Sequence, residues 1–367
     1  RPASGYTNQK EGLEWAIEFI YTHVFKDPLS RENLKTHSKL QQMQVIRSPN
    51  STNFEVRPDE WKVLLPVLDA IPNVIKHSIM PPSLPEISSA TNLLPSELSE
   101  LEALLKEKKQ IILEGPPGSG KTFVADKLAR FLTGNPLTGD HNDRIEIVQF
   151  HQSYGYEDFV QGIRPTTAEG GGLSYNVQPG IFLTLCQRAR EHPDLPYVLI
   201  IDEINRGNIS RIFGELLMLL EYRDKKIRLP YGACAGFEDG LLSIPDNLLI
   251  IGTMNSTDRS LAVIDYALRR RFYFYRLMPV VDGQAPTLRR WLEQQAFAPE
   301  EQGNIHQLFV AMNQALAKHG LPPDFQIGHS YFMRSDINTD VGRQRLWQWA
   351  IIPLIREYFH NAKDDKM

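Results

Sequence analysis

The sequence predicts an α/β fold built on a parallel β-sheet that helices cover on both faces. Short apolar runs alternate with stretches of helical periodicity between residues 93 and 278, as in sheets whose strands are joined by crossover helices. Gly115–Thr122, between the first run and a helical stretch, matches the phosphate-binding pattern GxxxxGK[ST]. After Pro279 the strand pattern stops and helical patterns dominate. We therefore expect a nucleotide-binding domain over 93–278 and a helical lid domain over 279–367.

Residues 1–92 form a third region of different character. Gly12–Phe25 and Trp61–Ile75 each carry apolar residues at helical spacing, so we expect two helices there, and the Pro-rich segment 81–85 is typical of a linker. Cationic and acidic residues are equally numerous in this region, which gives no electrostatic footprint for nucleic acid. Since the chain begins at Arg1 instead of Met, we expect this short, mainly helical region to be truncated.

The elements of the α/β domain follow from its periodicity. The apolar runs predict strands at Ile111–Glu114, Ile145–Phe150, Tyr197–Ile201, Leu248–Ile251 and Phe272–Tyr275. The stretches around them predict helices at Leu98–Lys108, Thr122–Thr133, Phe182–Arg190, Ile209–Glu221 and Ala262–Arg270. Two insertions, 170–177 and 225–244, are each expected to form a β-hairpin. In such a sheet the ligand lies at the carboxyl ends of the strands.

The loop Gly115–Thr122 is expected to hold the phosphates of a nucleotide. Its glycines let the backbone wrap closely around a polyphosphate, and the following helix points its positive end at the same oxygens. Lys121 would reach the outer phosphates, and Thr122 would hold Mg²⁺ through its hydroxyl. A Gly-rich turn without a ligand is the alternative, which the strand before the loop and the helix after it disfavour. The expected nucleotide-binding residues here are Gly115, Pro116, Pro117, Gly118, Ser119, Gly120, Lys121, Thr122 and Phe123.

Two carboxylates end the apolar run Tyr197–Ile201. We expect Asp202 to bind the hydrated Mg²⁺ and Glu203 to polarise the attacking water. Asn205 and Arg206 follow closely, and Asn205 is expected to help orient the water. The alternative is a buried strand that simply reaches the protein surface and ends there in two carboxylates. The phosphate loop upstream favours the catalytic pair.

A polar segment follows the run Leu248–Ile251. Asn255 is placed to orient the water or the terminal phosphate, and turn chemistry is the alternative, because Asn favours turns. Asp258, three residues further on, is counted with the nucleotide-binding residues.

Arg269, Arg270 and Arg271 close the next predicted helix. Cations stabilise a helix carboxyl end, but three in a row exceed what a cap requires. We expect Arg269 and Arg270 to reach the nucleotide of a neighbouring subunit as arginine fingers, which contribute roughly 10³–10⁵ in rate. Such a role requires a ring. Whether one of these arginines or Arg206 acts on the neighbour stays open.

Composition excludes other classes of protein. The net charge of −4 shows no basic excess that would bind nucleic acid or an anionic membrane unaided. The apolar runs are too short to span a bilayer, so we expect no membrane contact. Cys186 and Cys234 lack metal-ligand spacing, which favours buried thiols over a disulfide and suits a reducing cytoplasm.

In these motifs the chain resembles the AAA+ NTPases, and more narrowly the McrB family of GTP-hydrolysing motors from modification-dependent restriction systems. The resemblance covers about Leu105 to Phe359. It rests on Gly115–Thr122, Val148–Phe159, Asp202–Arg206, Met254–Phe272 and Ile327–Phe332. It implies GTP in preference to ATP, Mg²⁺, a hexameric ring, an McrC-like endonuclease partner that stimulates hydrolysis, and restriction of modified or foreign DNA. Contact with DNA is expected either directly or through the N-terminal region.

Several residues within the resemblance keep two interpretations. Val148–Phe159 either faces the centre of a ring, touching partner or DNA, or packs against the following insertion. His329 is either a packing residue of the lid or a nucleotide ligand. Gln326 stands where the family often has Arg. Met254–Asp258 corresponds to a family segment that has been compared with the guanine-reading motif of small GTPases, but Asn255 is also the expected sensor at the phosphate.

Two rival functions remain at this point. The first is an ATP-driven protein remodeller of the related MoxR type, which nucleotide preference and the neighbouring gene would separate from a restriction motor. The second is a nucleotide-gated assembly scaffold that hydrolyses slowly. The scaffold predicts that Glu203→Gln leaves biological activity intact, whereas the motor predicts its loss.

Overall fold

The computed structural model describes residues 81–139, 143–167, 172–257 and 266–364, and the backbone of two short segments nearer the N-terminus. These segments, β1 (Val24–Phe25) and β2 (Val74–Ile75), pair as an antiparallel ladder. The prediction of helix is therefore wrong for the last two residues of each expected helix. Valine, isoleucine and phenylalanine at these positions also favour strands. The rest of both helices lies outside the described residues. The contacts divide the chain into two units, 1–80 and 81–367.

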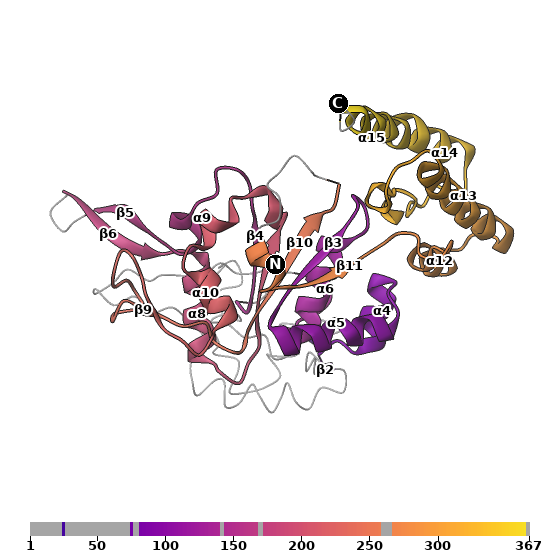
Figure 1. Ribbon diagram of the computed structural model, residues 1–367. Helices are drawn as coiled ribbons and strands as arrows, with labels where there is room; N and C mark the ends of the chain where they lie inside the picture. Colours follow the sequence, from indigo (N-terminus) through magenta and orange to yellow (C-terminus); the bar gives the residue numbers. More distant parts are fainter. Residues whose placement is uncertain are drawn as a thin grey trace, which may run out of the picture. The chain divides into compact units, whose positions relative to one another are not determined.

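The second unit contains the predicted parallel sheet, which has five strands (Figure 1). Their order across the sheet is β11 (Tyr273–Arg276), β3 (Gln110–Gly115), β10 (Leu248–Asn255), β7 (Tyr197–Asp202) and β4 (Ile145–Gln149). Asn255 lies opposite Gly115, and Gly252 lies opposite Ile201. The central position of β10 therefore brings the phosphate loop after β3 and the carboxylates that end β7 to one edge.

The sheet is buried on both faces because alternate residues of each strand point to opposite sides. Ile111 and Leu113 pack in one core with helices α4 (Leu84–Thr91), α5 (Pro95–Lys108) and α6 (Lys121–Thr133). Ile112, between them, packs in a second core against helices α8 (Ile181–Glu191), α9 (Ile209–Phe213) and α10 (Leu216–Glu221). Cys186 and Cys234 are buried and free, as expected. The predicted sandwich of helices around a parallel sheet is confirmed.

One of the predicted helices differs from the structure, and another is described only in part. The helix expected over Ile209–Glu221 is divided into α9 and α10 at Gly214, whose φ of 50° lies in the left-handed region. A Cβ at Gly214 would lie 3.2 Å from the Tyr156 ring, so the break also makes room for that side chain. The helix expected at Ala262–Arg270 is described over α11 (Tyr266–Arg269).

Helix α4 begins inside the segment expected to be a linker, 81–85. Its start is fixed by a capping box, in which Ser83 N–H donates to Glu86 Oε2 at 2.6 Å. The helix ends at Asn92, which adopts the left-handed conformation with φ 59°. The Ser-x-x-Glu signal was present in the sequence, but the surrounding prolines obscured it. The division of the chain at residue 92 stays a prediction.

Both insertions form hairpins, as predicted. The first pairs β5 (Gln161–Thr167) with β6 (Leu173–Pro179) and follows the short helix α7 (Tyr156–Phe159). It extends away from the sheet in Figure 1, and its strands are longer than expected. The second pairs β8 (Ile227–Arg228) with β9 (Leu241–Leu242).

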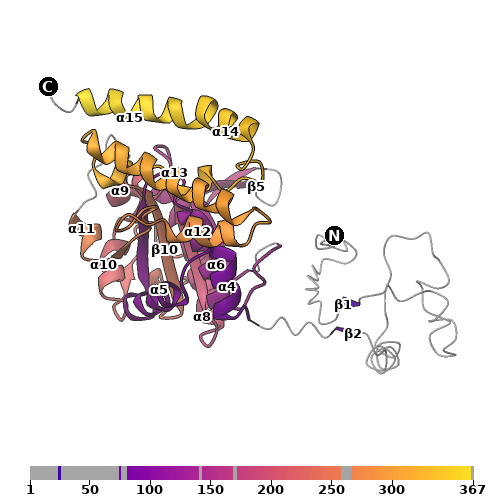
Figure 2. The same cartoon turned by 90° about the vertical axis from the view of Figure 1, so that its right-hand side faces the viewer.

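The lid is helical and has a core of its own, as predicted. It contains α12 (Pro286–Glu293), α13 (Pro299–Lys318), α14 (Asp340–Leu346) and α15 (Ile352–Asp364), which group together in Figures 1 and 2. A π-helical turn, Trp347–Ile351, joins the last two. Its core includes Leu288, Phe309, Phe332 and Ile351. Among the described residues, no helix has the length and apolar character needed to cross a bilayer.

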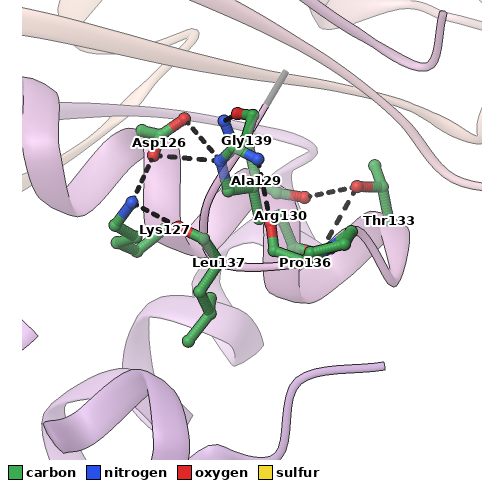
Figure 3. A network of polar contacts seen from close by, with 8 residues as sticks. All are labelled: Asp126, Lys127, Ala129, Arg130, Thr133, Pro136, Leu137 and Gly139. Atoms are coloured by element: carbon green, nitrogen blue, oxygen red, sulfur yellow. Dashed lines mark hydrogen bonds and ion pairs between the residues drawn. The ribbon is translucent and has the colours of Figure 1, made fainter. Parts of the chain in front are cut away.

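A polar network fixes the far end of α6, the helix that begins at the phosphate loop (Figure 3). Arg130, only 5% exposed, donates to Asp126, to Pro136 O at 2.9 Å and to Gly139 O at 2.7 Å. Lys127 donates to Leu137 O at 2.6 Å. These bonds hold the chain that leaves α6 against the helix, so α6 is anchored at the end opposite its phosphate-binding terminus.

Candidate active site

The phosphate loop lies between β3 and α6 and requires glycine at several positions. Gly118 and Gly120 have φ of 77° and 82°, which residues with a Cβ rarely adopt. A Cβ at Gly115 would lie 2.5 Å from Leu277 O. This local geometry turns the chain directly from the strand into the first residue of α6, Lys121. The amino end of the helix therefore faces the loop, which suits an anion.

Lys121 is buried and held by three acceptors. Its Nζ donates to Gly115 O and Pro116 O, each at 3.0 Å, and to Asn255 Oδ1 at 2.7 Å. The cation thus sits at the base of the loop and links it to the end of β10. A phosphate in the loop would compete with these carbonyl oxygens for its protons.

Asp202, Thr122 and Thr253 form an oxygen-rich group beside the loop. Asp202 Oδ1 accepts from Thr122 Oγ1 and from Thr253 Oγ1, each at 2.6 Å. Gln149 Nε2 lies 3.4 Å from Asp202 Oδ2. A hydroxyl and a carboxylate in contact are hard oxygen ligands, and Mg²⁺ typically binds one or two carboxylates together with phosphates and water. The residues present therefore fit Mg²⁺, which Thr122 and Asp202 would hold.

Glu203 is turned out of the strand and paired with Asn255. Its φ of 53° is unusual for a residue with a side chain and costs roughly 1–2 kcal/mol, a form of strain that concentrates at functional sites. Its N–H donates to Thr253 Oγ1 at 3.1 Å, and Asn255 Nδ2 donates to Glu203 Oε1 at 2.5 Å. Arg206 Nε lies 3.2 Å from Glu203 Oε2. Glu203 and Lys121 are thus joined through the Asn255 amide.

The other predicted catalytic residues occupy two places. Asn205 is buried near Glu203, and among the described residues its Oδ1 has no hydrogen-bond partner. Arg269 and Arg270 are exposed: the Arg269 guanidinium lies over the Phe274 ring, and Arg270 pairs with Glu221 at 2.8 Å.

Arg271 is different, because it donates to Leu217 O and pairs with Glu221 at 3.4 Å. It fastens the end of α11 to α10. Asp258 lies outside the described residues.

Most aromatic rings of the segment Val148–Phe159 pack inward, while its polar residues are largely exposed. Phe150 and Phe159 are buried in the core, and the Tyr154 ring stacks on Phe150 with centroids 5.0 Å apart. Tyr156 OH donates to Glu215 Oε1 at 2.5 Å. His151 is the exposed aromatic of this group. Packing therefore accounts for the rings of Phe150, Tyr154, Tyr156 and Phe159, and both interpretations stay open for the exposed residues.

The lid contacts the phosphate loop through backbone groups, which the sequence did not predict. Gly328 N–H donates to Pro117 O at 3.2 Å, and Ser330 N–H donates to Gly118 O at 3.0 Å. A Cβ at Gly328 would lie 2.0 Å from the Gly118 carbonyl carbon, so only glycine permits this approach. Gln326 instead bonds the Val280 backbone, at 2.9 and 3.1 Å, where the chain enters the lid.

A cavity of about 410 Å³ lies beside the loop, between the α4–α5 turn, the end of β11 and the lid. We call it the base cavity; its walls include Asn92, Ser119, Phe123, Trp291 and His329. Asn92 Oδ1, Ser119 Oγ and His329 Nδ1 are buried in these walls, and the described residues provide none of the three with a hydrogen-bond partner. Buried polar atoms are normally paired, so these three retain hydrogen-bonding capacity that the described residues do not use.

Sequence reasoning missed Asn92, which ends the predicted N-terminal region 1–92 and stands in no motif, and it left His329 open. Burial, with a smaller contribution from the nearby Lys121 cation, lowers the pKa of His329 to about 4. The imidazole is therefore neutral at pH 7. Together the loop, the carboxylates and the cavity define a nucleoside-triphosphate site of the P-loop class.

Comparison with known proteins narrows this class. Residues 110–272 match the family described as AAA domain (dynein-related subfamily), and residues 304–366 match the McrB α-helical lid domain. The chain belongs to the AAA+ NTPases and, with this lid, is McrB-like.

Two bacterial restriction proteins are among its relatives. It is 42% identical over 287 residues to the Type IV methyl-directed restriction enzyme EcoKMcrB subunit of Escherichia coli K12. This match covers 74% of this chain and 59% of that protein. It is 25% identical over 210 residues to the Type II restriction enzyme BsuMI component YdiS of Bacillus subtilis 168, covering 48% of this chain and 59% of that protein. The chain thus spans 59% of the length of each relative.

Proposed function

We propose that the chain is a cytoplasmic GTPase that assembles as a hexameric ring and drives an McrC-like endonuclease in the restriction of modified or foreign DNA. The hydrogen-bonded set of Lys121, Thr122, Asp202, Glu203 and Asn255 at one edge of the sheet carries the hydrolytic part. The 42% identity to a subunit named for methyl-directed restriction supports the biological part.

In this proposal each side chain has one task. Lys121 exchanges its carbonyl acceptors for the outer phosphates, and Thr122 and Asp202 hold Mg²⁺, which neutralises charge that develops on the phosphates. Glu203 polarises the attacking water. Asn255 fixes the position of the Glu203 carboxylate through their 2.5 Å hydrogen bond, and the unpartnered Asn205 Oδ1 accepts from the same water.

The arginines support a site shared between subunits. Arg271 is held inside its own subunit, whereas Arg269 and Arg270 are exposed at the end of α11. We infer that Arg269 and Arg270 act on the nucleotide of the neighbouring subunit. DNA contact, directly or through the N-terminal region, belongs to the same proposal.

The test is steady-state hydrolysis of GTP and ATP at matched Mg²⁺, with and without the neighbouring gene's product. We expect preference for GTP and stimulation by the partner. Glu203→Gln is expected to lower kcat by about 10²–10⁴ while nucleotide still binds, and to abolish restriction. The exposed Glu293→Gln, on α12, is the control and keeps full activity.

Two results would contradict the proposal. Preference for ATP without partner stimulation indicates a protein remodeller. Restriction that survives Glu203→Gln indicates a scaffold.

A further inference from the structure

We propose that guanine is selected by two hydrogen-bond acceptors at the α4–α5 turn, the Asn92 side-chain oxygen and the Glu97 carboxylate. This inference rests on the proposed GTPase function and deepens it. Asn255 is engaged elsewhere: its Oδ1 accepts from Lys121 and its Nδ2 donates to Glu203 at the phosphate edge. The base must therefore be read at another place in the site.

The base cavity is that place because it adjoins the phosphate loop. Ser119 and Gly120 of the loop line it, so a nucleotide whose phosphates occupy the loop extends its base into it. Its volume of about 410 Å³ falls within the usual range of ligand cavities. The apolar part of the wall suits the faces of a planar base and consists of Leu93, Val124, Leu277, Met278, Trp291 and Met333.

Asn92 supplies the first acceptor. The residue is 7% exposed, and within the described part of the chain its Oδ1 has no partner. Leaving a buried acceptor unpaired costs free energy that a hydrogen-bond donor on the ligand recovers. The left-handed backbone at Asn92 ends α4, and the residue lines the cavity.

Glu97 supplies the second acceptor, in the first turn of α5. Its Oε2 accepts the Leu94 N–H at 2.6 Å, which fixes the carboxylate beside the turn, and the side chain keeps 32% exposure. Arg290 of α12 donates to Asn92 O at 2.5 Å, and its Nη2 lies 3.9 Å from Glu97 Oε2. The lid helix thus contacts both residues, through the Asn92 backbone carbonyl and the Glu97 carboxylate.

An acceptor pair distinguishes guanine from adenine. The guanine edge carries the N1–H and the 2-amino group, which are adjacent donors suited to a carboxylate and an amide oxygen. Adenine has an unprotonated N1 at the equivalent position, and its lone pair is repelled by a carboxylate. A site whose buried polar groups are left unpaired by the wrong ligand rejects that ligand strongly.

The experiment measures equilibrium binding of four nucleotides in the Glu203→Gln background, where turnover is blocked. GTP, inosine triphosphate, xanthosine triphosphate and ATP differ only at the edge of the base. We expect inosine triphosphate, which lacks the 2-amino group, to bind about 10-fold more weakly than GTP. Adding Glu97→Gln is expected to weaken the binding of GTP by about 10- to 100-fold. It is expected to strengthen the binding of xanthosine triphosphate, whose 2-oxo group accepts from the new amide.

The variants are chosen to keep the fold. Gln at 97 still accepts the Leu94 N–H, because Glu and Gln both serve in a capping box. Asn92→Gly suits the left-handed backbone and is expected to weaken GTP about 10-fold. Glu100→Gln, an exposed carboxylate one turn further along α5, is the control and leaves all four affinities unchanged.

The outcomes separate this inference from the proposed function. One result would show that the acceptor pair does not read the base: GTP is preferred over ATP, but inosine triphosphate binds as tightly as GTP, and Glu97→Gln lowers the affinities for GTP and ATP by the same factor. In that case the GTPase proposal stands and this inference is overturned. If the unmodified pocket prefers ATP, the proposed GTP specificity itself is overturned.

Discussion

The phosphate edge and the base cavity differ in how their polar groups are satisfied. At the phosphate edge, which comprises Lys121, Thr122, Asp202, Glu203 and Asn255, every side chain is hydrogen-bonded to another group of the protein. In the base cavity, Asn92, Ser119 and His329 each bury a polar atom that has no partner in the described part of the chain. The edge is therefore preorganised without a ligand, whereas the cavity keeps polar atoms that the described residues leave unpaired.

The largest effect on stability is expected from acid. The pKa of His329 is about 4 in the folded protein and 6.5 in an unfolded chain, so above pH 6.5 neither state is charged. Between pH 6.5 and 4 only the unfolded state takes up a proton, and stability falls by about 3 kcal/mol over this window.

Chemical denaturation of the nucleotide-free protein at several pH values tests this. His329→Gln is expected to lose that part of the pH dependence, and the exposed His192→Gln to keep it. An unchanged slope in His329→Gln would show that the cavity does not bury a neutral imidazole.

A smaller loss is expected at the phosphate edge. Thr253, 1% exposed, donates to Asp202 and accepts from the Glu203 N–H, and Thr253→Val removes both bonds. The nucleotide-free protein should lose about 1–3 kcal/mol of unfolding free energy, because the Glu203 N–H is left unpaired and Asp202 Oδ1 keeps only the hydrogen bond from Thr122. The exposed Thr138→Val serves as the control. An unchanged free energy of unfolding in Thr253→Val would contradict the claim that the groups at this edge satisfy one another's hydrogen bonds.

The smallest effect, of opposite sign, is expected in the cavity. Ser119 is 2% exposed with an unpartnered Oγ, so Ser119→Ala removes a buried polar atom and breaks no bond of the described protein. The nucleotide-free protein should gain up to about 1 kcal/mol, while nucleotide affinity falls by up to about 10-fold. Thermal unfolding with and without nucleotide measures both. If Ser119→Ala destabilises the nucleotide-free protein, the proposed difference between the two regions is wrong.

The same contrast explains what the sequence could predict. The residues of the phosphate edge stand in short motifs at strand ends, and a parallel sheet with β10 between β3 and β7 necessarily gathers them. The cavity draws single residues from the α4–α5 turn, the phosphate loop and the lid, which no local pattern connects.

Particular misses have particular causes. The capping box at Ser83 was hidden among prolines, and the break at Gly214 follows from the room that the Tyr156 ring needs. The approach of Gly328 to Gly118 is a backbone contact between distant segments, for which side-chain patterns give no signal. The capping box is a local signal, whereas tertiary packing decides the other two.

The central claim is that the phosphate edge and the base cavity are two halves of one nucleotide site. Photo-cross-linking with an azido-purine nucleoside triphosphate, followed by peptide mass spectrometry, tests it most directly. The account predicts adducts on residues 90–97 or 329–333, the walls of the base cavity, that unlabelled nucleotide prevents and that Lys121→Ala abolishes by removing a phosphate contact. Adducts confined to other surfaces, or adducts that persist in Lys121→Ala, would contradict it.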